Sequence, residues 1–494
     1  MKDPLLQRVA TPLLCALLLG SALPVHAGRP APTNDFSKAE AGERAQGGDT
    51  THDKRLNADA FSHSSANLSF EKRLDFALGN GMFKKIWVSS PSSTTASDGL
   101  GPLYNARSCQ RCHLKDGRGH PPEGNYPQDT AVSMFLRLSI PPQNEAQRKA
   151  LAEGRLGVIP EPTYGGQLQD FAIQGLPAEG RMHIDYREIP VQLSDGETAS
   201  LRQPSYRITD LGFGPLHPQT LLSPRVAPPM IGLGLLEAID EADILAQQDP
   251  EDRDGDGISG RANQVWHRQR QALALGRFGW KAGNPTLNQQ NTSAFNGDIG
   301  ISNPDSPAPS GDCTVNQPLC LQAPNGNTEQ HDNQEISRQM TDLVLFYSRN
   351  LALPPRRDVD DPQVLAGKKV FYETGCIRCH TPKYVTGDNP ALPEQANQLI
   401  WPYSDLLLHD MGEGLADHRP EFLASGREWR TPPLWGIGLT ETVNDHSYFL
   451  HDGRARSLLE AILWHGGEAE PMKQAVIEMP RQQRANLIRF LESL

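Results

Sequence analysis

Two features are scarce in this 494-residue chain: long apolar segments and basic residues. After residue 27 no stretch is apolar enough to cross a membrane, which excludes a polytopic membrane protein. Lysine and arginine number 47 against 59 aspartates and glutamates, so the net charge is −12. Because phosphate binding needs a basic face, this balance argues against a nucleic-acid partner. Glycine (44) and proline (41) are abundant, which predicts many turns and ordered loops between modest helices.

Residues 1–27 have the features of a signal peptide. A basic start at Lys2 and Arg8 precedes an apolar run from Val9 to Leu23 and a small-residue cleavage site ending at Ala27. A membrane anchor is the alternative, but the run is shorter than the roughly 20 residues that a span needs. We therefore expect export to the periplasm and a mature chain without a membrane span.

Most of the seven cysteines fall into two identical motifs. Cys15 lies in the apolar run, and four others form the C-x-x-C-H units Cys109-Gln-Arg-Cys112-His113 and Cys376-Ile-Arg-Cys379-His380. This unit is the attachment signature of c-type haem, in which both thiols bond to the porphyrin and the adjacent histidine ligates the iron. A four-cysteine zinc site is the alternative, but it leaves both histidines unexplained. The sequence therefore predicts two covalently bound haem c groups.

The remaining cysteines, Cys313 and Cys320, lie close together in a loop rich in proline, asparagine and glycine. In an oxidising compartment this spacing favours a local disulfide over two free thiols.

The chain after a polar segment, residues 28–60, repeats one plan twice. We interpret residues 28–60 as a flexible lead-in. Each copy then has a helix containing Gly-x-x-x-Phe, a haem motif, an Arg-x-x-Pro-Pro or Arg-x-Pro-Pro segment and a final amphipathic helix. This order is the outline of a cytochrome c domain. The sequence predicts a mainly α fold of two cytochrome c-type domains, residues 61–356 with a large loop-rich insertion and residues 357–494.

An acidic loop in the insertion resembles a calcium-binding turn. Asp252, Asp254 and Asp256 alternate before Gly257, and the backbone carbonyl of Ile258 stands at the seventh position. Oxygen ligands at positions one, three, five and seven suit Ca²⁺, although the bidentate glutamate of an EF-hand is missing. A solvated acidic turn is the alternative reading.

Taken together, the motifs resemble those of the bacterial di-haem oxidoreductases, also called di-haem thiol oxidoreductases. These are relatives of the di-haem cytochrome c peroxidases and of the methylamine-utilisation di-haem enzyme. No cysteine remains for thiol chemistry once the motifs and the 313–320 pair are counted. The matching stretches are Asn105–Cys109, Ser223–Gly234, Asp252–Gly260, Gly276–Ala282, Leu406–Gly412 and Phe449–Gly453.

The resemblance implies the distal side of each haem. His465 falls where the peroxidases carry methionine, so we expect His380 and His465 to ligate haem 2, with Met411 as the alternative ligand. Phe295 falls at the matching place of the first copy and cannot ligate iron, which implies an open haem 1. Histidines of the insertion are the rivals that would close it: His120, His183 and His217.

The resemblance also suggests an aromatic residue between the haems, for which Trp280 is the candidate. Glu161 and Gln167 are candidates for proton transfer. The activity implied is reduction of hydrogen peroxide at haem 1, with electrons entering through haem 2 from a small cytochrome or cupredoxin. The alternatives are a non-catalytic electron-transfer protein, which a closed haem 1 would favour, and oxidation of a bulky substrate.

Overall fold

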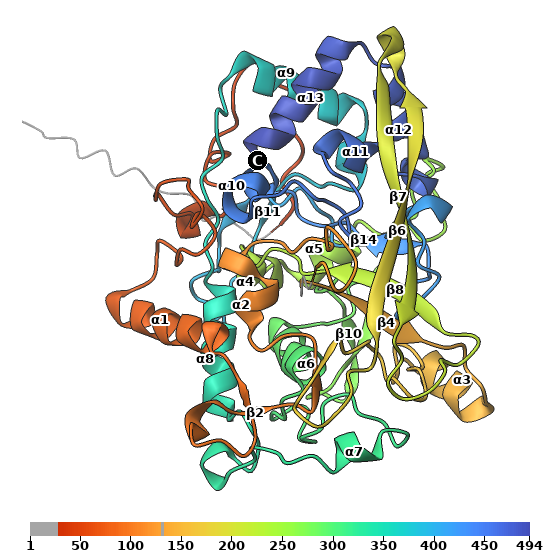
Figure 1. Ribbon diagram of the computed structural model, residues 1–494. Coiled ribbons are helices and arrows are strands. Elements are labelled where there is room, and N and C mark those ends of the chain that lie inside the picture. The colour runs from red at the N-terminus through yellow and green to blue at the C-terminus, as the bar shows by residue number, and fades with distance from the viewer. Residues whose placement is uncertain (1–27, 130–132) are drawn as a thin grey trace, which may run out of the picture.

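The computed structural model describes residues 28–129 and 133–494 (Figure 1). Helices and strands are mixed throughout this part of the chain, and the strands form seven two-stranded sheets. The predicted mainly α fold is therefore corrected to a mixed one. The cause lies largely in the insertion, where alternating apolar and polar residues form antiparallel strand pairs instead of loops.

The helices and strands have the following bounds. The helices are α1 (Phe70–Lys84), α2 (Cys109–Cys112), α3 (Glu145–Ala152), α4 (Leu233–Glu237), α5 (Glu241–Leu245), α6 (Leu287–Ile299), α7 (Pro318–Leu321), α8 (Arg338–Arg349), α9 (Pro362–Glu373), α10 (Thr440–Asn444), α11 (Leu458–Leu463), α12 (Glu470–Glu478) and α13 (Arg481–Ser493). The strands are β1 (Val88–Ser89), β2 (Asp98–Leu100), β3 (Leu103–Tyr104), β4 (Met134–Ser139), β5 (Phe171–Ala172), β6 (Arg181–Gln192), β7 (Thr198–Thr209), β8 (Leu221–Val226), β9 (Gln264–His267), β10 (Ala272–Leu275), β11 (Tyr384–Val385), β12 (Leu399–Ile400), β13 (Leu408–Asp410) and β14 (Glu428–Arg430).

In the first copy, α1 crosses α8 at a glycine. A Cβ atom placed on Gly79 would lie 2.3 Å from the carbonyl oxygen of Leu343, so only glycine allows this approach. One turn further on, the ring of Phe83 lies 5.3 Å from that of Tyr347 on α8. The buried face of α1 thus fixes the position of the segment that leads to the first haem motif.

The second copy repeats this crossing with α9 and α13. A Cβ atom on Gly367 would lie 1.9 Å from the carbonyl oxygen of Asn486, and the rings of Phe371 and Phe490 are 5.2 Å apart. Asp361 caps α9 by accepting from the backbone N–H of Gln363 at 2.8 Å. In each copy the helix before the haem motif therefore packs on the final helix, as the repeat predicts. The identity of the two units as cytochrome c-type domains stays a prediction.

Residues 28–60, for which the composition predicts a flexible lead-in, lie against the second copy and the end of the first instead. The carboxylate of Glu43 is buried between Arg356 and Lys368, with an Nζ–Oε2 distance of 2.8 Å for the lysine. The backbone of Gly28 also pairs with Val385 in β11. The buried charges of this polar segment have partners of opposite charge. The segment can therefore pack against one side of the second copy.

The insertion contributes two longer strand pairs. β4 pairs with β8 from Met134–Val226 to Ser139–Leu221, and β6 pairs with β7 over their full lengths. Along β4 the buried side chains alternate with Phe135 and Arg137, which face the cavity described below. Figure 1 shows the β6–β7 ribbon running along one side of the molecule, from the insertion to α11 and α12.

Candidate functional site

The first haem motif places one histidine with a defined tautomer. α2 carries Cys109 and Cys112, and His113 follows directly. The Nδ1 atom of His113 lies 2.8 Å from the carbonyl oxygen of Pro228. Because a carbonyl only accepts, Nδ1 donates and Nε2 keeps its lone pair for a metal. Burial lowers the pKa of His113 to about 4, so the imidazole is neutral, as iron ligation requires. We call this place site 1.

The second motif repeats the arrangement with a different carbonyl. A short 3-10 turn, Cys376–Arg378, precedes Cys379 and His380. The Nδ1 atom of His380 donates to the carbonyl oxygen of Tyr403 at 2.8 Å. Burial, more than the neighbouring His465, lowers the pKa of His380 to about 4. Its Nε2 is therefore also available as a ligand atom, and we call this place site 2.

A cavity of about 380 Å³ adjoins site 1 and includes Cys109, Cys112 and His113 in its walls. Two carboxylates, Asp298 and Glu421, line it together with a larger number of guanidinium groups. Such a basic, largely apolar chamber fits the propionates and the ring of a haem. The arginines in the lining are Arg118, Arg137, Arg225, Arg268, Arg277, Arg419 and Arg430.

The helix that faces site 1 is α6. Its N-cap Thr286 accepts from the N–H of Gln289 at 3.1 Å, as Ser457 of α11 accepts from Glu460 at 3.1 Å. Aligning the two caps pairs His465 with Ala294, one residue before the expected Phe295. Ala294 and Phe295 both line the cavity, and neither can ligate iron.

In the second copy, His465 lies just after α11. Its Nδ1 donates to the carbonyl oxygen of Ala461 at 2.8 Å, which again leaves Nε2 as the free ring nitrogen. Burial lowers the pKa of His465. Met411, the alternative ligand, packs partly buried in the same apolar cluster as Trp464. Both candidates thus lie in one region, and the choice between them stays a prediction.

The three histidines proposed as rivals at site 1 lie elsewhere. The Nδ1 of His120 faces the carbonyl oxygen of Pro121, and the Nε2 of His183 lies 2.7 Å from Arg207 on the ribbon. His217 donates its backbone N–H to Glu161. Within the described part of the chain, none of the three lines the cavity.

Trp280 lines the cavity and is held by its indole N–H, which donates to the carbonyl oxygen of Val226 at 2.9 Å. Its ring packs against two clusters, one containing Met134 and the other containing Trp464 of the second copy. The candidate relay therefore lies between the two copies.

Glu161 and Gln167, the candidates for proton transfer, do not line the cavity at site 1. Glu161 accepts from three backbone N–H groups, including that of Tyr164 at 2.6 Å, and so fixes a turn. Gln167 donates to Asp298 at 3.0 Å and does not itself line the cavity.

Sequence reasoning missed a buried charge network between the copies. Asp417 pairs with Arg225 at 2.9 Å and with Lys281 at 3.0 Å. Burial alone would raise the pKa of Asp417, but these two cations outweigh it and hold that pKa below its usual range. Both cations lie over the ring of Trp429, on which His451 stacks at 3.7 Å. Arg225, Lys281 and His451 stand in the stretches that carry the family resemblance, which was the available signal.

The acidic loop brings its three carboxylates together. Oxygen atoms of Asp252, Asp254 and Asp256 lie within 4.8 Å of one another on the surface. Asp256 accepts from the N–H of Ile258 at 2.9 Å and pairs with Arg378 of the second haem motif at 3.4 Å. Calcium binding at this loop stays a prediction.

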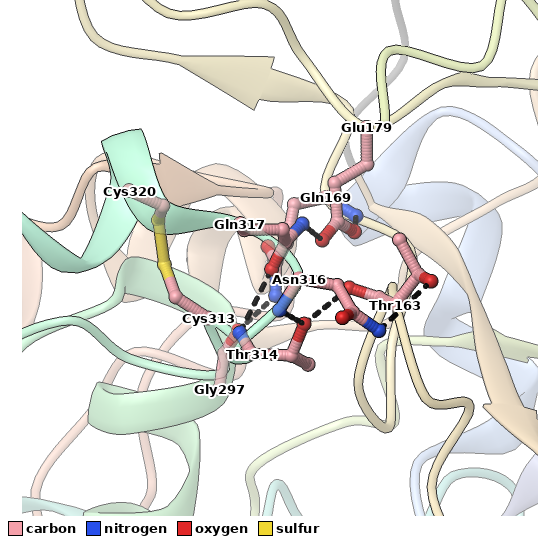
Figure 2. Close-up of a disulfide and its surroundings, with 9 residues drawn as sticks. All are labelled: Thr163, Gln169, Glu179, Gly297, Cys313, Thr314, Asn316, Gln317 and Cys320. Carbon is pink, nitrogen blue, oxygen red and sulfur yellow. Dashed lines mark hydrogen bonds between the residues drawn. A yellow bond between two sulfur atoms is a disulfide. The ribbon is translucent and has the colours of Figure 1, made fainter. Parts of the chain in front are cut away.

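Cys313 and Cys320 form a disulfide with a Cα–Cα distance of 6.1 Å. Figure 2 shows how the loop that it closes bonds to the insertion. The side chain of Gln317 in this loop donates to Glu179 at 2.6 Å, and Glu179 also accepts from the backbone N–H of Gln169. The side chain of Gln169 donates to the carbonyl oxygen of Gly297 on α6. The loop therefore fastens the insertion to the helix that faces site 1.

The predicted signal peptide, residues 1–27, lies outside the described residues. Among those that are described, no helix is both long and apolar enough to cross a bilayer.

Two C-x-x-C-H motifs, each with a neutral histidine whose Nε2 can ligate iron, are typical of a redox protein that holds two haems. The chain belongs to the family described as "Di-haem oxidoreductase, putative peroxidase", whose model matches residues 40–494. Haem is therefore the cofactor that the family implies. Among curated proteins no relative matches. A solved structure of hydrazine synthase from Kuenenia stuttgartiensis is 17% identical and has a TM-score of 0.23, covering 43% of this chain and 72% of the other. That likeness is too low to carry an argument.

Proposed function

We propose that the protein is an exported di-haem c-type cytochrome oxidoreductase that reduces hydrogen peroxide at site 1. Electrons enter through site 2 from a small periplasmic cytochrome or cupredoxin. The observation that carries the proposal is the difference between the helices facing the two sites, which offer Ala294 and Phe295 at site 1 and His465 at site 2. An iron with one protein ligand can bind peroxide, whereas an iron with two is suited to electron transfer.

Thioether bonds from Cys109 and Cys112, and from Cys376 and Cys379, would hold the two haems. When bound, haem supplies the redox-active iron and the electron path. The chain's own contribution is the ligand orientation: each proximal histidine is fixed by a backbone carbonyl, at Pro228 and at Tyr403.

Reduction of one peroxide to two waters consumes two electrons and two protons, so site 1 needs proton carriers. Two carboxyl groups in its cavity have pKa values shifted in opposite directions. Burial raises the pKa of Asp298. Burial would also raise the pKa of Glu421, but nearby arginines, led by Arg419, hold that pKa below its usual range. In our proposal Glu421 accepts the proton of peroxide and Asp298 donates one to the departing oxygen.

Trp280 is our candidate for electron transfer between the sites. Its place at the cavity wall and against the cluster around Trp464 supports this role. An aromatic ring held by a hydrogen bond keeps a fixed position between two redox centres.

The test counts irons by spin state in the oxidised protein matured with both haems. We expect one high-spin and one low-spin signal by electron paramagnetic resonance. His465→Ala should remove the low-spin signal, and His183→Ala, a histidine outside the cavity, should leave both unchanged. Two low-spin irons that stay low-spin on partial reduction would contradict the proposal and favour the electron-transfer protein. Intact mass showing fewer than two bound haems would contradict covalent attachment.

A further inference from the structure

The helix that precedes His465 is too short to hold its own position. α11 has 6 residues, whereas α6 at site 1 has 13 and packs against α8. Isolated helices well below about 12 residues are marginal in water, so the orientation of α11 depends on the groups that contact it. The ribbon of β6 and β7 provides many of these groups, although it belongs to the insertion of the first copy.

The apolar side of the ribbon covers α11. Leu193 and Leu201 are buried in one cluster with Leu463 and Trp464, the two residues that precede His465. Figure 1 shows the ribbon beside α11 and α12. The hydrophobic contact therefore reaches the end of the helix from which the ligand candidate projects.

A carboxylate joins the ribbon to the first turn of α11. Glu460 has a side chain that is only 6% exposed. It accepts from the backbone N–H of Arg202 on β7 at 2.6 Å and from that of Arg456 at 2.8 Å. The guanidinium of Arg456 also reaches Glu188 on β6 through two bonds of 2.9 Å. Charge-assisted bonds of this kind fix both direction and distance.

The ribbon also holds the turn that leads into α11. The side chain of Arg202 donates to the carbonyl oxygen of Gly453 at 2.9 Å and to that of Arg454 at 3.3 Å. The hydroxyl of Tyr206 donates to Asp452 at 2.9 Å. The turn before the helix is thereby held by two residues of β7.

The tip of the ribbon is anchored beyond the helix. Ser194 donates to the carbonyl oxygen of Met479 at 2.5 Å, and Glu197 pairs with Arg484 of α13 at 2.7 Å. These contacts hold the tip of the ribbon against the second copy.

We propose that the β6–β7 ribbon is a positioning device that keeps His465 on the iron of site 2. This inference rests on the proposed function, in which His465 is that ligand. The residues Arg202 and Glu460 act through α11 and the turn before it, and neither lines the cavity at site 1. The first copy therefore sets the ligation of the second haem.

The test compares ribbon variants of the protein carrying both haems. Arg202→Ala removes the side-chain bonds to the turn, and Glu460→Gln removes the charge that joins ribbon and helix. We expect a weaker low-spin signal of site 2 and binding of added cyanide at that site about tenfold faster or more, as for other groups that orient metal ligands. Arg187→Ala is the matched control, because this exposed arginine of β6 bonds across the ribbon to Gln203 and, within the described residues, has no bond to α11 or its turn. It should behave as the wild type.

His465→Ala separates the two claims. If it leaves site 2 unchanged, the proposed ligand is wrong. If it changes site 2 while Arg202→Ala and Glu460→Gln do not, His465 is the ligand and the positioning role of the ribbon is wrong. Circular dichroism and haem content check folding. Should Arg202→Ala not fold, Glu188→Ala removes the exposed contact to Arg456, together with a bond from Ser200 within the ribbon, and must still speed cyanide binding relative to Arg187→Ala.

Discussion

The two copies share their proximal side and differ on the distal side. In both, a glycine allows two helices to cross, and a backbone carbonyl fixes the Nδ1 of the motif histidine at 2.8 Å. Across from them, α6 presents Ala294 where α11 is followed by His465. The comparison predicts that the residue at this one position, and not the haem motif, distinguishes the reactivity of the two sites.

Each copy also completes the site of the other. Arg419 and Glu421 of the second copy line the cavity at site 1. In return, the ribbon of the first copy holds α11 beside site 2. The buried pairs of Asp417 with Arg225 and Lys281 also join the two copies.

The largest expected effect comes from making site 1 resemble site 2. We predict that Ala294→His supplies a distal ligand and converts the high-spin signal to low-spin. If the ligand occupies the iron 99% of the time, the rate of peroxide reduction falls about 100-fold, because only the open fraction reacts. Paramagnetic resonance and a peroxidase assay measure the two results.

Ala294→Leu is the control for bulk at the same position, since leucine cannot ligate iron. A high-spin signal that survives in both variants would show that the alignment of α6 with α11 by their N-caps is wrong.

The helix crossings provide a test of what the copies share. Gly79→Ala and Gly367→Ala should each lower the free energy of unfolding by about 3 kcal/mol, because the added methyl group meets a backbone oxygen that cannot move aside. Denaturant titration measures the loss. Gly81→Ala, on the same helix as Gly79 but with open space around it, should instead stabilise by up to about 1 kcal/mol. Tolerance at only one crossing would show that the copies do not share this packing.

The parts of the molecule that follow local rules could be predicted from sequence. These parts are short patterns in which residue spacing alone indicates what will form: the two haem motifs, the Gly-x-x-x-Phe helices and the 313–320 cysteine pair. The insertion could not be predicted in the same way, because β6 and β7 owe their stability to each other and to α11.

Long-range contacts also explain what was missed at site 1. Glu421 lies far along the chain from His113, and only the fold brings both to one cavity. Glu161, a candidate for proton transfer from the sequence, uses its carboxylate to fix a turn. The segment 28–60 has a polar composition, yet its charges find buried partners such as Lys368 that no local pattern reveals.

The disulfide tests a support that only the first copy has. Replacing Cys313 and Cys320 together by serine should lower stability by about 2 kcal/mol, the entropy expected for a loop of this size. The effect should be local to site 1, where the loop fastens the insertion to α6, and the low-spin signal of site 2 should not change. A change confined to site 2 would contradict the place that we assign to this loop.

The smallest expected effect comes from Asp170, a buried carboxyl group of the first copy. Burial raises the pKa of Asp170 to about 7, and one carboxyl oxygen, Oδ1, lies buried without a hydrogen-bond partner. Between pH 4 and 7 the folded chain therefore holds a proton that the unfolded chain has lost, so stability falls as the pH rises. For one such group the loss is about 1 kcal/mol from pH 5 to 6.

Asp170→Asn should reduce the loss of stability between pH 5 and 6 by this amount, which denaturant titrations at the two pH values measure. Asp185→Asn, on the exposed face of β6, is the control and should parallel the wild type. If Asp170→Asn also parallels the wild type, the surroundings of Asp170 in the first copy are more hydrated than its burial indicates.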